Sequence, residues 1–120
     1  MNTFTDRKTK CKPSLAEALA GVKRPRLNGR FSTKALIALD DYVRQHGRIA
    51  IDGPAPQVPV RAVRGRDGWS LIIDECPFCG CFHSHGGENG DQPGNYGHRC
   101  AHCGPWFDTP GYDLVPEDAE

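Results

Sequence analysis

Apolar and polar residues follow a helical period over residues 32–46. The apolar stripe consists of Ala35, Leu36, Leu39, Tyr42 and Val43. Ser32 is a residue type that favours the N-cap of a helix, and Gly47 is one that ends helices. The pattern therefore predicts one amphipathic helix. Its exposed face has too few bases for a recognition helix, which favours packing of the apolar stripe against a sheet.

Further along the chain, the pattern changes to the two-residue period of β-strands. Residues 58–64 and 69–75 are separated by a Gly-Arg-Asp-Gly turn, which predicts a β-hairpin. The apolar face of its second strand is formed by Trp69, Leu71 and Ile73. Shorter strands are predicted at residues 48–52, 106–107 and 112–115.

Composition limits the size of the core. Only 38% of the 120 residues are hydrophobic, and 14 glycines with 10 prolines make much of the chain turn and loop. This excludes a helical bundle, a coiled coil or a parallel α/β enzyme core. We expect a small α+β protein in which residues 53–116 form one domain that packs against a helix and short strand at residues 31–52. The first residues contain no apolar signal segment, and no stretch is long enough to span a membrane, so a cytoplasmic protein is predicted.

The formal net charge is zero, yet the charges are unevenly distributed. Residues 1–30 contain eight Lys or Arg and two acidic residues, whereas residues 108–120 contain five acidic residues and no base. We expect a basic, mostly disordered arm at residues 1–30, interrupted by a brief helix at 13–20, and an acidic tail at 117–120. The bases expected to contact nucleic acid are Lys23, Arg24, Arg26 and Arg30.

Four of the six cysteines form two C-x2-C pairs with a gap of twenty residues between them. Two such pairs on facing turns supply the four tetrahedral ligands that zinc prefers. A small domain with few aliphatic residues also needs such a metal for its stability. The spacing therefore predicts a structural zinc site with the ligands Cys76, Cys79, Cys100 and Cys103.

The cysteine pairs belong to longer motifs. Residues 76–87 read CPFCGCFHSHGG and residues 97–103 read GHRCAHC. Together these motifs resemble small zinc-ribbon-like proteins that are encoded by actinobacteria and their phages and whose function is largely unassigned. The resemblance implies zinc-ribbon-like β-hairpins and a phage or mobile-element origin. Because Cys100 occupies a variable position of the family motif, it also implies a second possible ligand set, in which the fourth donor is His83 or His85.

Four of the five histidines lie near these cysteines, namely His83, His85, His98 and His102. They can surround a single zinc ion, or one of them can bind it. A third possibility is a second, open metal site built from His83, His85 and His98, which is the only route to hydrolysis that the sequence offers. The remaining cysteines, Cys11 and Cys81, are expected to be free thiols.

These features predict a non-enzymatic zinc-binding accessory protein that contacts nucleic acid or a nucleoprotein complex. One alternative is a protein–protein adaptor with a purely structural zinc, which would bind through its acidic tail and through Trp106, Phe107 and Tyr112. Another is a metal-dependent, nuclease-like hydrolase. The sequence contains no dinucleotide-binding, Walker or nucleophile-elbow motif, so it indicates no small-molecule substrate.

Overall fold

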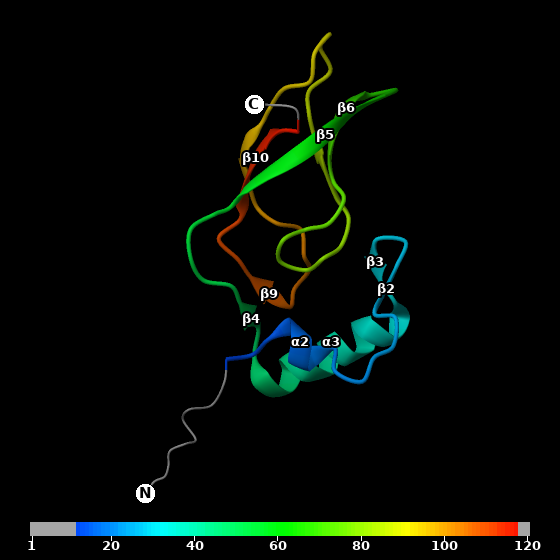
Figure 1. Cartoon of the computed structure of the whole chain (residues 1–120), viewed down its shortest axis with the longest axis vertical. Helices are drawn as coiled ribbons and strands as arrows, with labels where there is room; N and C mark the ends of the chain where they lie inside the picture. Colours follow the sequence, from blue (N-terminus) through cyan, green and yellow to red (C-terminus); the bar gives the residue numbers. More distant parts are fainter. Residues whose placement is uncertain (1–11, 118–120) are drawn as a thin grey trace, which may run out of the picture.

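The computed structural model describes residues 12–117 and shows a small α+β protein (Figure 1). Two helices and a two-stranded hairpin lie at one end, and a curled sheet of five strands lies at the other. Two short parallel strands, β4 (Ile49–Ala50) and β9 (Phe107–Asp108), pair between these parts. Within residues 12–117, no helix has the length and apolar character needed to cross a membrane.

The five-stranded sheet has the strand order β7-β6-β5-β10-β8. Its strands are β5 (Gln57–Gly65), β6 (Gly68–Ile73), β7 (His83–Gly86), β8 (Gly97–Arg99) and β10 (Tyr112–Pro116). Strands β5 and β6 form a hairpin that closes at the pair Gly65 and Gly68. Strand β10 runs parallel to β5, with Leu114 opposite Val58, and antiparallel to β8. The sheet therefore joins segments that are far apart along the chain.

Helix α3 (Thr33–His46) is bounded by local signals in the sequence. At its start, the Ser32 hydroxyl accepts a hydrogen bond from the backbone N–H of Ala35 at 3.1 Å. At its end, Gly47 has a φ of +92°, a conformation that glycine adopts without strain. The main packing partners of α3 are helix α2 (Leu15–Ala18) and strand β3 (Arg30–Phe31), whereas the sequence pattern favours packing against a sheet.

Within residues 1–30, expected to be a mostly disordered arm with a brief helix at 13–20, the described part contains one short helix and two short strands. Helix α2 is capped by Ser14, and a tight turn then joins β2 (Arg26–Leu27) to β3 (Arg30–Phe31). The turn residues Asn28 and Gly29 both have positive φ, as two-residue hairpin turns require. The predictions for residues 1–11, including Cys11, and for residues 118–120 lie outside the described part of the chain.

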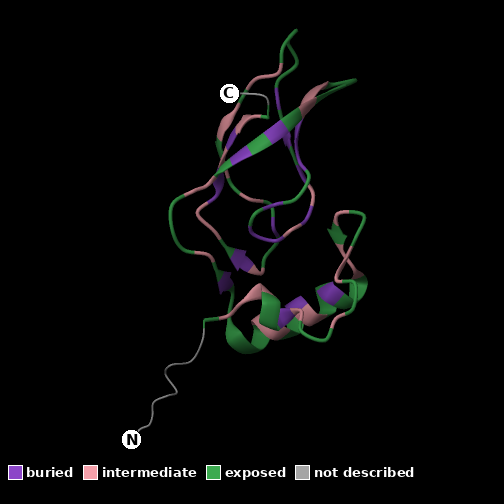
Figure 2. Cartoon of the chain, viewed as in Figure 1, coloured by how far each residue is buried: buried purple, intermediate pink, exposed green. Residues whose placement is uncertain are grey.

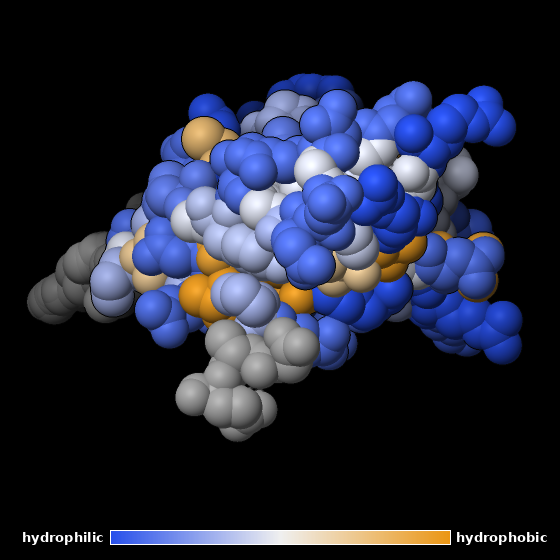
Figure 3. Space-filling view, turned by 90° about the horizontal axis from the view of Figure 1, so that it is seen from above, coloured by the Kyte–Doolittle hydropathy of each residue, from blue (hydrophilic) through white to orange (hydrophobic). Residues whose placement is uncertain are grey.

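Most of the buried hydrophobic residues form one cluster that extends from the helices into the sheet (Figure 2). Its largest fully buried members include Tyr112, Leu39, Ile49, Leu71 and Leu114. Four cysteines also belong to the cluster: Cys76, Cys79, Cys81 and Cys103. The surface shown in Figure 3 is mainly hydrophilic, with small separate apolar patches. The thiols are therefore part of the core and not of the surface.

Candidate metal centre

The first cysteine pair lies on a tight loop between strands β6 and β7. The backbone N–H of Gly80 donates to the carbonyl oxygen of Cys76 at 2.9 Å, and the N–H of Cys76 donates to that of Cys81 at 2.9 Å. Within the loop, the N–H of Phe78 donates to the Cys76 sulfur at 3.3 Å. These bonds orient both cysteine side chains of the pair towards the interior, where Cys76 and Cys79 are 2% and 1% exposed.

The hairpin β2–β3 holds this loop from outside. The guanidinium of Arg26 donates to the carbonyl oxygen of Cys79 from Nε at 2.9 Å and from Nη2 at 2.6 Å. The N–H of Phe82 donates to the carbonyl oxygen of Gly29 at 2.7 Å. Gly80 has a φ of +79°, and a Cβ at this position would lie 2.7 Å from Arg26 Nε. The positive φ therefore favours glycine, and any larger residue would also displace the guanidinium of Arg26.

Strand β7 brings a histidine to the two cysteines. His83 and His85 are both buried and alternate with exposed residues, so they lie on the same face of the strand. The Nε2 atom of His83 lies 3.2 Å from the sulfur of Cys79. The fourth group comes from the segment after β8, because the sulfur of Cys103 lies 3.7 Å from that of Cys76 and 3.8 Å from His83 Nε2.

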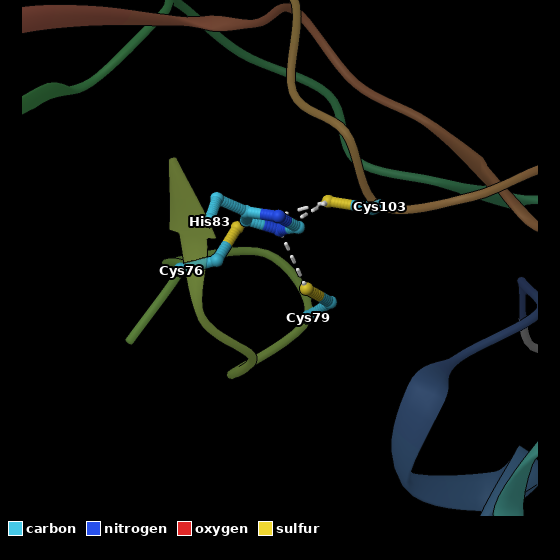
Figure 4. A group of neighbouring side chains, drawn as sticks. All are labelled: Cys76, Cys79, His83 and Cys103. Atoms are coloured by element: carbon cyan, nitrogen blue, oxygen red, sulfur yellow. Dashed lines mark hydrogen bonds between the residues drawn. The ribbon is translucent and has the colours of Figure 1, made fainter. Parts of the chain in front are cut away.

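The ligand atoms of Cys76, Cys79, His83 and Cys103 all lie within 4.8 Å of one another (Figure 4). A zinc ion with Zn–S bonds of ~2.3 Å places tetrahedral sulfur ligands ~3.8 Å apart, and a nitrogen ligand slightly closer. Three of the separations among these atoms, 3.7, 3.2 and 3.8 Å, are near these values. The four side chains are therefore close enough to hold one metal ion.

The buried thiols are electrostatically unequal. Hydrogen bonds from the Cys103 and Cys79 thiols lower the pKa of Cys76 far below its usual value. The hydrogen bond to Cys76 in turn raises the pKa of Cys103. Thiolates at this spacing repel one another, so without a cation the three thiols cannot all be deprotonated. A divalent cation removes this repulsion because it binds thiolates as ligands.

The group that the structure brings together differs in one member from the expected set of four cysteines, Cys76, Cys79, Cys100 and Cys103. Cys100 is exposed and is not part of the cluster. It directly follows β8, whose pairing with β10 places it in a separate surface cavity of about 220 Å³ that also contains Arg48 and Phe107. The fourth member of the group is His83, one of the two alternatives that the family resemblance implies. The spacing C-x2-C-x3-H of residues 76–83 is the signal in the sequence that indicates this choice.

The other histidines have different partners. His85 Nε2 shares a hydrogen bond of 2.8 Å with the Tyr112 hydroxyl, and its ring lies 4.7 Å from that of His102. His98 Nδ1 lies 3.0 Å from a carboxylate oxygen of Asp113. Among the described residues, His83, His85 and His98 do not form a second metal-binding group. The three histidines that the sequence offers for an open site therefore have separate surroundings.

The predicted nucleic-acid ligands separate into two kinds. Lys23, Arg24 and Arg30 are exposed, and within residues 12–117 none of them forms a salt bridge. Arg26 is partly buried and donates to the backbone of Cys79, and its guanidinium also lies 5.2 Å from the Phe31 ring centroid. Arg26 thus serves the fold, a role that residue type alone does not reveal.

Two further sequence expectations concern side chains near the core. Phe107 and Tyr112, proposed as adaptor contacts, are 5% and 0% exposed and cannot present a surface to a partner. Cys81 is a free, buried cysteine.

Comparison of the chain with family models, with curated proteins and with solved structures finds no match. The assignment of function therefore depends on the geometry of the site.

Proposed function

We propose that Cys76, Cys79, His83 and Cys103 bind one zinc ion with a structural role. The observation that carries this proposal is the convergence of four buried ligand atoms within 4.8 Å. Three sulfur donors and one imidazole favour zinc over the hard cations magnesium and calcium. With four protein ligands, the coordination shell has no vacant position for a substrate or an activated water, as is typical of structural sites.

The arrangement of strands supports a zinc-ribbon-like classification of this region. Strand β6 leads into the loop of Cys76 and Cys79, and β7 leads out of it with His83. Cys103 follows β8, which pairs with the closing strand β10. The first two ligands thus lie in the loop between β6 and β7, the third begins β7, and the fourth lies in the segment after β8. In the simplest zinc ribbon each half of the site supplies two ligands, whereas here the second half supplies only Cys103.

We further propose that the protein is a non-enzymatic accessory protein that contacts nucleic acid or a nucleoprotein complex. Support comes from Lys23, Arg24 and Arg30, which are exposed and have no acidic partner among the described residues. Such cations bind phosphates with release of counter-ions. Two other bases of the same region already have acidic partners, because Arg44 pairs with Asp40 and Arg48 pairs with Asp108.

Metal analysis of the purified full chain tests the first proposal. We expect one zinc per chain. Removal of the metal by a strong chelator should lower the melting temperature, and zinc but not magnesium should restore it, because zinc-finger peptides gain on the order of 10 kcal/mol from the metal. A chain that folds equally well after chelation would contradict a structural zinc.

Salt dependence tests the second proposal. Replacement of Lys23, Arg24 and Arg30 by glutamine should flatten the dependence of nucleic-acid affinity on salt by two to three ion equivalents, as expected at ~0.9 per phosphate contact. The control replaces Arg44, Arg48 and Arg61 by glutamine, which changes the net charge equally but at residues that have acidic partners. Equal slopes for both variants would contradict this assignment.

A further inference from the structure

An open cavity of about 280 Å³ lies beside the metal ligands. The hairpin β2–β3, helix α3 and the two cysteine-containing segments all contribute to its walls. The residues that line it are Gly29, Arg30, Phe31, Leu36, Cys79, Cys81, Phe82, His83, His102 and Cys103. Three of the four proposed zinc ligands are thus among its lining residues, while the fourth, Cys76, is not.

The lining combines flat apolar surface with positive charge. Phe31 and Phe82 contribute aromatic rings, and Leu36 contributes an aliphatic side chain that is 40% exposed. Arg30 and His102 supply the polar groups, and no acidic residue lines the cavity. Aromatic rings beside an arginine are the features with which proteins bind unpaired bases, since every base has a π-face.

The positive charge continues beyond the cavity. The N–H of Ser32 donates to the carbonyl oxygen of Pro25 at 2.8 Å, which brings the chain next to Arg24 alongside the start of α3. Lys34 lies in the first turn of that helix, is exposed, and has no acidic partner among the described residues. One cation in the lining, Arg30, and two exposed cations on the adjoining segments fit a chain of phosphates better than a single carboxylate.

We propose that this cavity binds one unpaired base of a single-stranded nucleic acid. The base packs against Phe31, Phe82 and Leu36, and Arg30 binds the adjoining phosphate. Lys34 and Arg24 neutralise neighbouring phosphates of the same strand. This inference rests on the proposed contact with nucleic acid and specifies its form. A duplex keeps its bases stacked inside the helix. Its phosphates can therefore bind the cations, but its bases cannot enter the cavity.

Two adjacent residues of α3 allow a matched test. Leu36 lines the cavity, whereas Ile37 is 58% exposed and does not. The variants Leu36→Glu and Ile37→Glu change the net charge identically and place the new carboxylate on the same helix. The zinc-loaded full chain is titrated into a fluorescein-labelled oligothymidylate and into a labelled duplex, and binding is followed by fluorescence anisotropy.

We expect Leu36→Glu to weaken binding of the oligothymidylate about 5- to 150-fold, the range of one base–aromatic contact, because a carboxylate in the cavity prevents the base from packing against Phe31 and Phe82. Ile37→Glu should weaken it only a few-fold, through charge alone, and the two variants should bind the duplex equally. Zinc content and circular dichroism verify that each variant is folded. If Leu36→Glu does not fold, Phe82→Leu, which removes a ring and keeps apolar volume, takes its place and should weaken single-strand binding several-fold.

Other outcomes overturn the inference in distinguishable ways. Equal weakening by Leu36→Glu and Ile37→Glu, or equal affinity for the duplex and the single strand, leaves the nucleic-acid contact intact and excludes the cavity as its base-binding site. Absence of binding to either nucleic acid at low salt overturns the proposed function and this inference together. If an acidic peptide with one phenylalanine binds in a manner that depends on Leu36 while oligothymidylate does not, the cavity is a peptide site.

Discussion

The guanidinium of Arg26 donates two hydrogen bonds to the carbonyl oxygen of Cys79, a residue 53 positions later in the chain. This contact ties the N-terminal hairpin to the loop that carries two of the proposed zinc ligands. A charged donor that bonds twice to one partly buried carbonyl is a strong interaction, and its geometry is particular to arginine. The loop of the metal site is therefore supported by a segment outside the motif that defines it.

Substitution of Arg26 tests this support. Arg26→Gln should lower the free energy of unfolding by about 2 kcal/mol, because hydrogen bonds to charged groups contribute ~1.5–3 kcal/mol. Lys23→Gln removes the same charge from an exposed side chain and should change stability by less than ~0.5 kcal/mol. Urea denaturation of the zinc-loaded proteins measures both values. Similar losses in the two variants would show that charge, and not the contact with Cys79, is responsible.

Substitution of Gly80 provides a second test of the contact between Arg26 and the loop of Cys79. Gly80→Ala introduces a Cβ that would lie 2.7 Å from Arg26 Nε in a residue with a φ of +79°. Gly47→Ala introduces the same backbone strain at a φ of +92°, with nothing within 4 Å of the new Cβ. Strain alone costs ~1–2 kcal/mol, so Gly80→Ala should be the more destabilising of the two by thermal denaturation. Equal melting temperatures would indicate that Arg26 moves aside without cost.

The choice of the fourth ligand is tested by metal content. His83→Ala should lower the zinc content and broaden the unfolding transition, because the small core depends on the metal. Cys100→Ala should leave the zinc content unchanged and alter stability by no more than ~0.5 kcal/mol, since Cys100 is exposed. Inductively coupled plasma mass spectrometry gives the stoichiometry. Loss of zinc in Cys100→Ala, with retention in His83→Ala, would reinstate the arrangement of four cysteines.

A pH prediction concerns His85. Its burial, together with the nearby charges of His102 and Arg99, lowers its pKa to about 4. An unfolded chain, with an ordinary pKa of ~6.5, then binds more protons than the folded chain as the pH falls between these values. The stabilising contribution of neutral His85 is therefore present above pH ~6.5 and is lost as the pH falls towards 4.

Titration by NMR measures this effect directly. In the zinc-loaded protein, the imidazole of His85 should remain neutral at pH ~5.5, where an ordinary histidine is mostly charged. His85→Gln keeps a polar group that can reach the Tyr112 hydroxyl and should show a shallower loss of stability on acidification. A titration of the His85 resonances near pH 6.5 would disprove the shift.

Features with local causes could be predicted from the sequence. Ser32 and Gly47 mark the ends of the helix that the structure places at Thr33–His46. The Gly-Arg-Asp-Gly segment marks the turn between β5 and β6. The spacing of Cys76 and Cys79 indicates a metal-binding loop because the two sulfurs of such a pair share one turn. Each of these signals lies within a few residues of the feature that it specifies.

Features that depend on distant contacts could not be predicted. No pattern in the sequence specifies the parallel pairing of β10 with β5, because the short apolar run around Leu114 could pair with another strand in several registers. Cys100 and His83 differ in role only because β7 and β8 place one inside and the other outside. Arg26 is chemically indistinguishable from its exposed neighbours until the fold brings Cys79 to it.

The order of the ligands along the chain has a consequence for synthesis on the ribosome. Cys76, Cys79 and His83 lie within a segment of eight residues, whereas Cys103 follows His83 by 20 positions. At ~5–20 residues per second, three donors are available for about 1–4 s before the last one is made. The strand that completes the sheet, β10, comes later still. If these four residues bind zinc as proposed, a nascent chain holds three of the ligands first, and the synthesis of Cys103 completes the ligand set before the sheet can close.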